Sequence, residues 1–219
     1  MCLSTQQGQL SLKRAIDRAA VMGLSMNPQE GKAALVAING KVEYWPMKNG
    51  LVEIAHESGK VEFIASETVY SGDQFALTKT AKGDDYQWIP AIKNRGEPSG
   101  FFSVLVLTSG RSVVKWMTLE QMQAWKTKYG KGLNNPKSAW NTNFNGMAEK
   151  TMLKRVTTGV YLGKRMETAL ELDEEIEKEP INITPKTPTE TVGDEIRERQ
   201  EGSQTIEGEA HPVQDSELF

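Results

Sequence analysis

Hydrophobic positions along the chain follow helical spacing in some stretches and strand-like alternation in others. Residues 11–22 place apolar side chains on one helical stripe, which predicts an amphipathic helix that ends at Gly23. The apolar residues 33–38 and the alternating residues 41–46 flank an Asn-Gly pair, which favours a tight hairpin turn. A short helix over residues 50–59 is expected to follow.

Two more hairpins are predicted in the middle of the chain. Strands are expected at residues 60–70 and 73–79, and again at 101–107 and 111–116, because short turns containing glycine separate the members of each pair. Residues 80–100 are polar and rich in glycine, proline and charge. They predict a loop with one short strand that forms a mobile flap.

Two helices should accompany these strands. The first is expected to begin after Thr118, because Thr118 and Gln121 have the spacing of a capping box, and its core face would consist of Leu119, Met122, Trp125 and Tyr129. The second should begin near Trp140, where apolar residues recur at helical spacing. Gly159 and Gly163 predict a break in the helical pattern that follows.

The helix that starts near Trp140 also has a basic face. Lys150 and Lys154 stand four residues apart, where like charges cost an isolated helix roughly 0.2–0.5 kcal/mol, so an anionic partner would relieve their repulsion. Arg155 falls within the apolar arc, and we expect its stem to be packed and its guanidinium to meet an acceptor. On charge and spacing alone, a solvated basic face explains these residues equally well.

Although the net charge is only −3, acidic and basic residues are distributed unevenly along the chain. From Glu171 onward there are 15 acidic and 4 basic residues, whereas the preceding part holds 22 basic and 14 acidic residues. Apolar periodicity is lost and prolines accumulate over residues 173–219, which predicts a disordered acidic tail. A basic body suits a polyanionic partner such as nucleic acid.

Several kinds of chemistry are disfavoured by the sequence. One cysteine and two histidines exclude an internal disulfide and argue against metal sites built on these residues. There is no glycine loop for nucleotide phosphates. Asp84 and Asp85 could bind a divalent ion, but no partner for them can be named. An apolar run of about 18 residues and a secretory leader are both lacking, so a cytoplasmic protein is expected.

After the turn at Asn134 and Asn135, a set of residue types recurs in a characteristic order: Trp140, Phe144, Met147, Ala148, Lys150, Thr151, Lys154 and Arg155. This order resembles the W…F…MAxKTxxxR signature of the RecT family of phage single-strand annealing proteins. Further resemblances lie at Gly23, Leu24, Gly31, Ala33 and Leu35, at Gly50, Leu51, Ala55, Ser58 and Gly59, and at Val69, Gly72, Asp73 and Phe75. Asn49 stands where the family has Arg or Lys, and Lys48 lies one place earlier.

The resemblance implies an α+β fold, in which a small antiparallel β-sheet of hairpins packs with helices as in a RecT or Red beta annealing core. The chain would divide into a short N-terminal helix at 1–22, the annealing core at 23–172 and the disordered acidic tail at 173–219. The implied activity is ATP-independent binding of single-stranded DNA and annealing of complementary strands in phage-type homologous recombination. The resemblance implies no catalytic residue and no cofactor, with Mg²⁺ only as a modulator of pairing.

The expected DNA contacts are Lys150, Lys154 and Arg155, with weaker candidates at Lys48, Arg111, Lys115, Lys126 and Lys128. Expected partners are single-stranded DNA, the annealed duplex, further copies in a ring or helical filament, and a phage 5′-to-3′ exonuclease in the bacterial cytoplasm. The acidic end DSELF resembles the tip of bacterial single-strand DNA-binding proteins, which adds the host protein of that class as a partner.

Two hypotheses from other classes stay open. The chain could be an interaction module whose basic helix docks an acidic protein, in which case it would not prefer DNA over other polyanions. It could also be a metal-dependent nuclease, which would require cleavage that depends on Mg²⁺.

Overall fold

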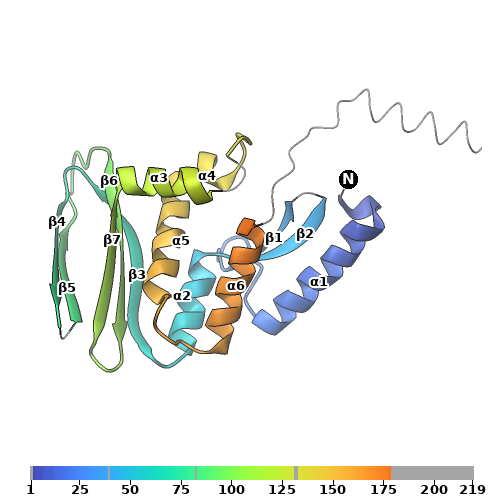
Figure 1. Ribbon diagram of the computed structural model, residues 1–219, viewed down its shortest axis with the longest axis horizontal. Coiled ribbons are helices and arrows are strands. Elements are labelled where there is room, and N and C mark those ends of the chain that lie inside the picture. Colours follow the sequence, from blue (N-terminus) through green and yellow to red (C-terminus); the bar gives the residue numbers. More distant parts are fainter. Residues whose placement is uncertain (1, 39, 82, 131–132, 179–219) are drawn as a thin grey trace, which may run out of the picture. The chain divides into compact units, whose positions relative to one another are not determined.

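The computed structural model describes residues 2–38, 40–81, 83–130 and 133–178 (Figure 1). The chain starts with η1 (Cys2–Ser4), a single 3-10 turn, and α1 (Gln6–Met22). α1 begins earlier than predicted because the Thr5 side chain caps it by accepting a hydrogen bond from the Gly8 amide at 3.0 Å. It ends, as predicted, at Gly23, whose φ of 63° is left-handed.

α1 packs on the predicted hairpin of β1 (Ala33–Ile38) and β2 (Lys41–Pro46). Asn39, in the turn of this hairpin, lies outside the described residues. The Ser11 hydroxyl accepts a hydrogen bond from the Val42 amide at 2.8 Å. Buried side chains of α1 also enter a large apolar cluster, which we call the main core. Its members include Met22, Tyr44, Leu51, Leu153 and Met166. The predicted N-terminal helix is therefore packed into the same body as the residues that follow it.

The next strands form a three-stranded antiparallel sheet with the order β3 (Val61–Tyr70), β6 (Pro98–Leu107), β7 (Ser112–Thr118). α2 (Lys48–Glu57) precedes β3 and buries one apolar face. β6 is covered on both faces, because its neighbouring residues Phe101 and Phe102 point to opposite sides and both are buried. This explains the continuous apolar run in its sequence.

β4 (Gln74–Thr80) and β5 (Gly83–Ile89) form a separate hairpin on one face of that sheet. The expectation of a mobile flap is wrong for β5, because its aromatic residues alternate with polar ones and pack inward. Tyr86 and Trp88 lie with ring centroids 5.4 and 5.2 Å from that of Phe102. The hairpin is thus a second β layer.

Asp73, one of the residues that carry the resemblance, anchors this layer through its buried side chain. Its carboxylate accepts hydrogen bonds from the Tyr70 amide at 3.1 Å, the Ala91 amide at 2.9 Å and the Trp88 indole at 3.3 Å. Arg95 pairs with both oxygens, with Nε and Nη2 at 3.0 and 2.5 Å. The bond from Arg95, supported by these other donors, holds the pKa of Asp73 well below its usual range.

The opposite face of the sheet carries α3 (Leu119–Tyr129), α4 (Ala139–Thr142) and α5 (Phe144–Thr157) (Figure 1). The capping box at the start of α3 is confirmed, since Thr118 and Gln121 exchange both hydrogen bonds. One predicted core position of α3 is wrong: Tyr129 is 47% exposed and contacts only the rim of the cluster through the Trp125 ring.

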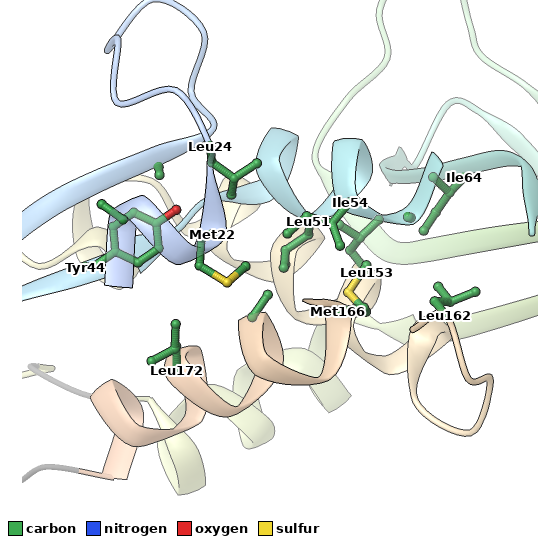
Figure 2. Packing of buried hydrophobic residues seen from close by; sticks show 14 of the residues in the cluster. Met22, Leu24, Tyr44, Leu51, Ile54, Ile64, Leu153, Leu162, Met166 and Leu172 are labelled. Atoms are coloured by element: carbon green, nitrogen blue, oxygen red, sulfur yellow. The ribbon is translucent and has the colours of Figure 1, made fainter. Parts of the chain in front are cut away.

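The last described element is α6 (Lys164–Lys178), which follows the predicted break after α5. Its Met166 and Leu172 face Met22 and Leu51 across the main core (Figure 2). α6 continues beyond Leu172, so the first six residues assigned to the tail, 173–178, are helical. The rest of the predicted tail lies outside the described residues.

The predicted fold class is confirmed: the protein is an α+β fold of small antiparallel sheets and helices. No helix in the part of the chain that the structure describes is long and apolar enough to span a bilayer.

Candidate nucleic-acid interface

α5 carries the three strongest predicted DNA contacts. The helix is capped by the Asn143 side chain, which accepts a hydrogen bond from the Gly146 amide at 3.2 Å. Met147, Ala148 and Met152 fix one face against the sheet. The Lys150 and Lys154 side chains, one turn apart, reach toward α6 and β2.

Both lysines converge on the carboxylate of Asp173 in α6. Lys150 Nζ donates to Oδ1, and Lys154 Nζ lies 2.5 Å from Oδ2. The Trp45 indole N–H, from β2, also donates to Oδ1, and Lys150 Nζ lies 4.6 Å from the centroid of the Trp45 ring. The lysine side chains are 8% and 13% exposed and that of Asp173 is fully buried. Three N–H donors from two elements therefore surround one anion, which we call the Asp173 cluster.

The electrostatics of the Asp173 cluster keep the carboxylate ionised. Burial by itself raises the pKa of Asp173, but the charges of Lys150 and Lys154 and their hydrogen bonds outweigh it and hold that pKa below its usual value. The anionic partner that the spacing of the two lysines calls for is thus supplied from within the chain.

Lys48, the weaker candidate from α2, belongs to a second polar cluster around Glu149 of α5. Its ammonium lies 2.7 Å from the Glu149 carboxylate and donates to the Ser66 carbonyl at 2.8 Å. Glu149 also accepts a hydrogen bond from Thr68 at 2.8 Å. Beside them, burial raises the pKa of Glu67, partly offset by the charge of Lys48. The Lys48 charge is therefore compensated by neighbouring carboxylates.

Arg155 is exposed, so the expectation that its stem would be packed is wrong. The reason is that the buried face of α5 rotates along the helix. Its first half packs in the cluster around Phe101, whereas Leu153 and Val156 pack in the main core with α2 and α6. Within the described residues Arg155 has no ion pair, and its guanidinium is available to an anionic ligand.

The four remaining candidates lie beside the β6–β7 turn, in β7 and in α3. Arg111 is exposed after the β6–β7 turn, and Lys115 is half-buried in β7. At the opposite end of β7, Lys126 in α3 donates to the Trp140 carbonyl at 3.1 Å, and the exposed Lys128 lies beside Tyr129. The structure thus brings Lys150 and Lys154 together and places the other candidates on separate surfaces.

Sequence reasoning missed Trp45 and Asp173. Asp173 follows Met166 and Ala169 at helical spacing, so its place on an apolar stripe was a signal that its carboxylate is buried. Trp45 follows Tyr44 in an alternating strand, and the buried Tyr44 fixes Trp45 on the other face. Neither signal identifies the partner across the fold.

A cavity of about 270 Å³ lies between α1, β2 and the end of α6. Its charged lining consists of Arg14, Arg18, Lys41, Glu43 and Glu175. Arg18 bridges the two carboxylates, at 3.0 Å from Glu43 and 2.9 Å from Glu175. The end of α6 therefore supplies a counter-charge to this second basic region as well.

The two carboxylates considered for a divalent ion are engaged in local contacts. Asp84 accepts a hydrogen bond from the Val114 amide at 2.8 Å and pairs with Lys79 at 3.0 Å, while Asp85 accepts one from the Tyr86 amide. Among the described residues, no three His, Cys, Asp or Glu side chains are grouped so that they could hold a metal ion.

Comparisons with known proteins point in one direction. The model of the RecT family matches residues 9–188. Protein RecT of Escherichia coli (strain K12) is 25% identical over 195 residues, which cover 84% of this chain and 69% of that protein.

Proposed function

Because this chain belongs to the RecT family, we propose that it binds single-stranded DNA without sequence preference and anneals complementary strands without ATP during recombination. It would act as a binding protein rather than a catalyst, leaving the base edges free to pair.

The structural observation that supports this proposal is the arrangement of α5. Two lysines one turn apart, aided by an indole N–H, are arranged around a single anion, and the exposed Arg155 follows directly. A DNA backbone is a series of such anions, and Lys and Arg that neutralise it gain affinity by releasing counterions. We assign Lys150, Lys154 and Arg155 to the main DNA-binding surface, which we call the track. The remaining candidates, Lys48, Arg111, Lys115, Lys126 and Lys128, would make secondary contacts.

The proposal extends to the partners. Copies of the chain would assemble into a ring or helical filament, so that neighbouring tracks become continuous, and a 5′-to-3′ exonuclease would expose the strand in the cytoplasm of a bacterial host. A host single-strand DNA-binding protein is a further proposed partner.

The deciding experiment follows the pairing of two complementary fluorescent oligonucleotides with and without the protein, in the absence of ATP and with EDTA in one arm. Faster pairing in both arms supports annealing. DNA binding without faster pairing refutes annealing, and strand cleavage that EDTA abolishes would support the nuclease hypothesis. Absence of DNA binding, with capture of acidic proteins instead, would favour the docking module.

A variant tests the assigned track without unfolding the chain. Lys150→Met with Lys154→Met and Asp173→Leu replaces a buried ion cluster by apolar side chains of similar size, which is often neutral for stability. Loss of two phosphate contacts should reduce the salt slope of single-strand binding by about 1.4, at about 0.7 per contact. The control, Lys137→Gln with Lys164→Gln and Glu171→Gln, changes the net charge equally at exposed positions. Equal slopes for the two variants would remove α5 from the track.

A further inference from the structure

We propose that Lys150, Lys154 and Trp45 form a binding site for a backbone phosphate of single-stranded DNA, which Asp173 occupies until a strand displaces it. For the strand to enter, the end of α6 unwinds after Leu172, from Asp173 onward. This inference rests on the proposed function, and it adds Trp45 as a DNA-binding residue and Asp173 as a displaceable occupant.

The donors of the Asp173 cluster have the composition of a phosphate site. Two ammonium groups and one indole N–H point at the two oxygens of the carboxylate, and no donor of this set comes from α6 itself. α5 and β2 would therefore keep the donors in place if α6 released its carboxylate. A phosphate oxygen accepts the same charge-assisted hydrogen bonds as a carboxylate oxygen.

After Leu172, the side chains of α6 that the structure describes contact the body through charge. Met166, Ala169 and Leu172 are buried in the core, Asp173 pairs with the two lysines, and Glu174 and Glu175 are exposed. Four acidic residues lie between 173 and 177, at the helix terminus where negative charge opposes the helix dipole. The last turns can thus unwind while the anchored part of α6 remains in place.

Unwinding would uncover a longer basic surface than the phosphate site alone. Glu175 is two residues beyond Asp173 and pairs with Arg18, which lines the cavity with Arg14 and Lys41. Loss of Glu175 leaves Arg18 with Glu43 as its counter-charge. One short acidic segment therefore neutralises basic groups on both α1 and α5, and a strand that replaces it would contact both.

Hydrogen exchange on the unmodified chain tests the proposal. The protein is saturated with a poly-dT oligonucleotide, binding is verified by fluorescence anisotropy in the same sample, and exchange of α6 amides is followed by mass spectrometry. Amides of residues 173–178 should exchange at least tenfold faster in the complex, because they lose their helical hydrogen bonds, while those of residues 166–170 keep their rate. Unchanged or slower exchange at 173–178 with DNA bound would overturn the displacement. Absence of binding would overturn the proposed function itself.

A pair of variants with the same change in charge gives a second test. Asp173→Asn weakens the occupant, whereas Glu171→Gln removes one negative charge from an exposed position of the same helix. If the open state has a population below about 1% in the unmodified chain, removing the occupant raises DNA affinity up to about a hundredfold or more. A folded Asp173→Asn variant that binds no more tightly than Glu171→Gln would refute the exchange of carboxylate for phosphate.

Discussion

Removal of the Asp173 carboxylate should be among the most damaging single substitutions in the described part of the chain. Asp173→Ala leaves the ammonium groups of Lys150 and Lys154, 8% and 13% exposed, side by side without this counter-charge. Breaking a buried ion pair from one side costs about 3–5 kcal/mol, because the remaining charge stays desolvated. We therefore expect a fall of that size in the free energy of unfolding at neutral pH.

The pH dependence of the difference between the variant and the unmodified chain follows from the same geometry. Burial raises the pKa of Asp173, but the charges and hydrogen bonds of Lys150 and Lys154 outweigh it and hold the folded pKa below the unfolded value of about 3.9. The contribution of the carboxylate is therefore present above that value and is lost as pH falls through the folded pKa, so Asp173→Ala and the unmodified chain should converge in acid. Urea unfolding followed by circular dichroism at about pH 7 and about pH 3 measures both effects.

Glu171→Ala, an exposed position on the same helix, serves as the control for Asp173→Ala. The reasoning would be refuted if the two variants differed by less than about 1 kcal/mol at neutral pH, since exposed charges contribute about that much or less. A difference between Asp173→Ala and the unmodified chain that stays the same at both pH values would contradict the lowered folded pKa of Asp173.

Three further predictions concern stability and are measured by urea unfolding. The variant with Lys150→Met, Lys154→Met and Asp173→Leu should stay within about 1 kcal/mol of the unmodified chain, and a loss as large as that of Asp173→Ala would contradict it. Asp73→Asn should cost about 2 kcal/mol at neutral pH through the weakened pairing with Arg95. Because folding lowers the pKa of Asp73, this contribution is present above the unfolded value of about 3.9 and is lost as pH falls below it, so the variant and the unmodified chain should converge in acid. Gly50→Ala would place a Cβ 2.2 Å from the Lys32 carbonyl oxygen, and should cost about 1–3 kcal/mol, whereas Gly40→Ala meets no neighbour within 4 Å and tests φ strain alone.

Local patterns in the sequence were sufficient to predict much of the fold. The end of α1 at Gly23 and the start of α3 at Thr118 depend on neighbours within one turn, so the residue types there determine the outcome. A short strand was predicted within residues 80–100, but its place in a second β layer was not, because β5 is held by rings on a distant strand, above all Phe102.

The candidate site was less predictable, because its geometry depends on contacts across the chain. Lys150 and Lys154 were identified by their spacing, but nothing local indicates that their amines are buried against α6. Arg155 was misplaced because a single helical phase was applied to a helix that packs against two different clusters. Asp173 was assigned to the tail on charge, although its apolar neighbours on the helical stripe contradict that assignment.

The Asp173 cluster also has a consequence for the order in which the chain can fold. The Trp45 indole and the Asp173 carboxylate are separated by 128 residues, so this contact joins nearly the whole described chain. During synthesis α5 emerges before Asp173, and docking it at that stage would bury two ammonium groups without their carboxylate. The core around α5 should therefore close only after α6 has emerged, which makes the last described helix the step that completes folding.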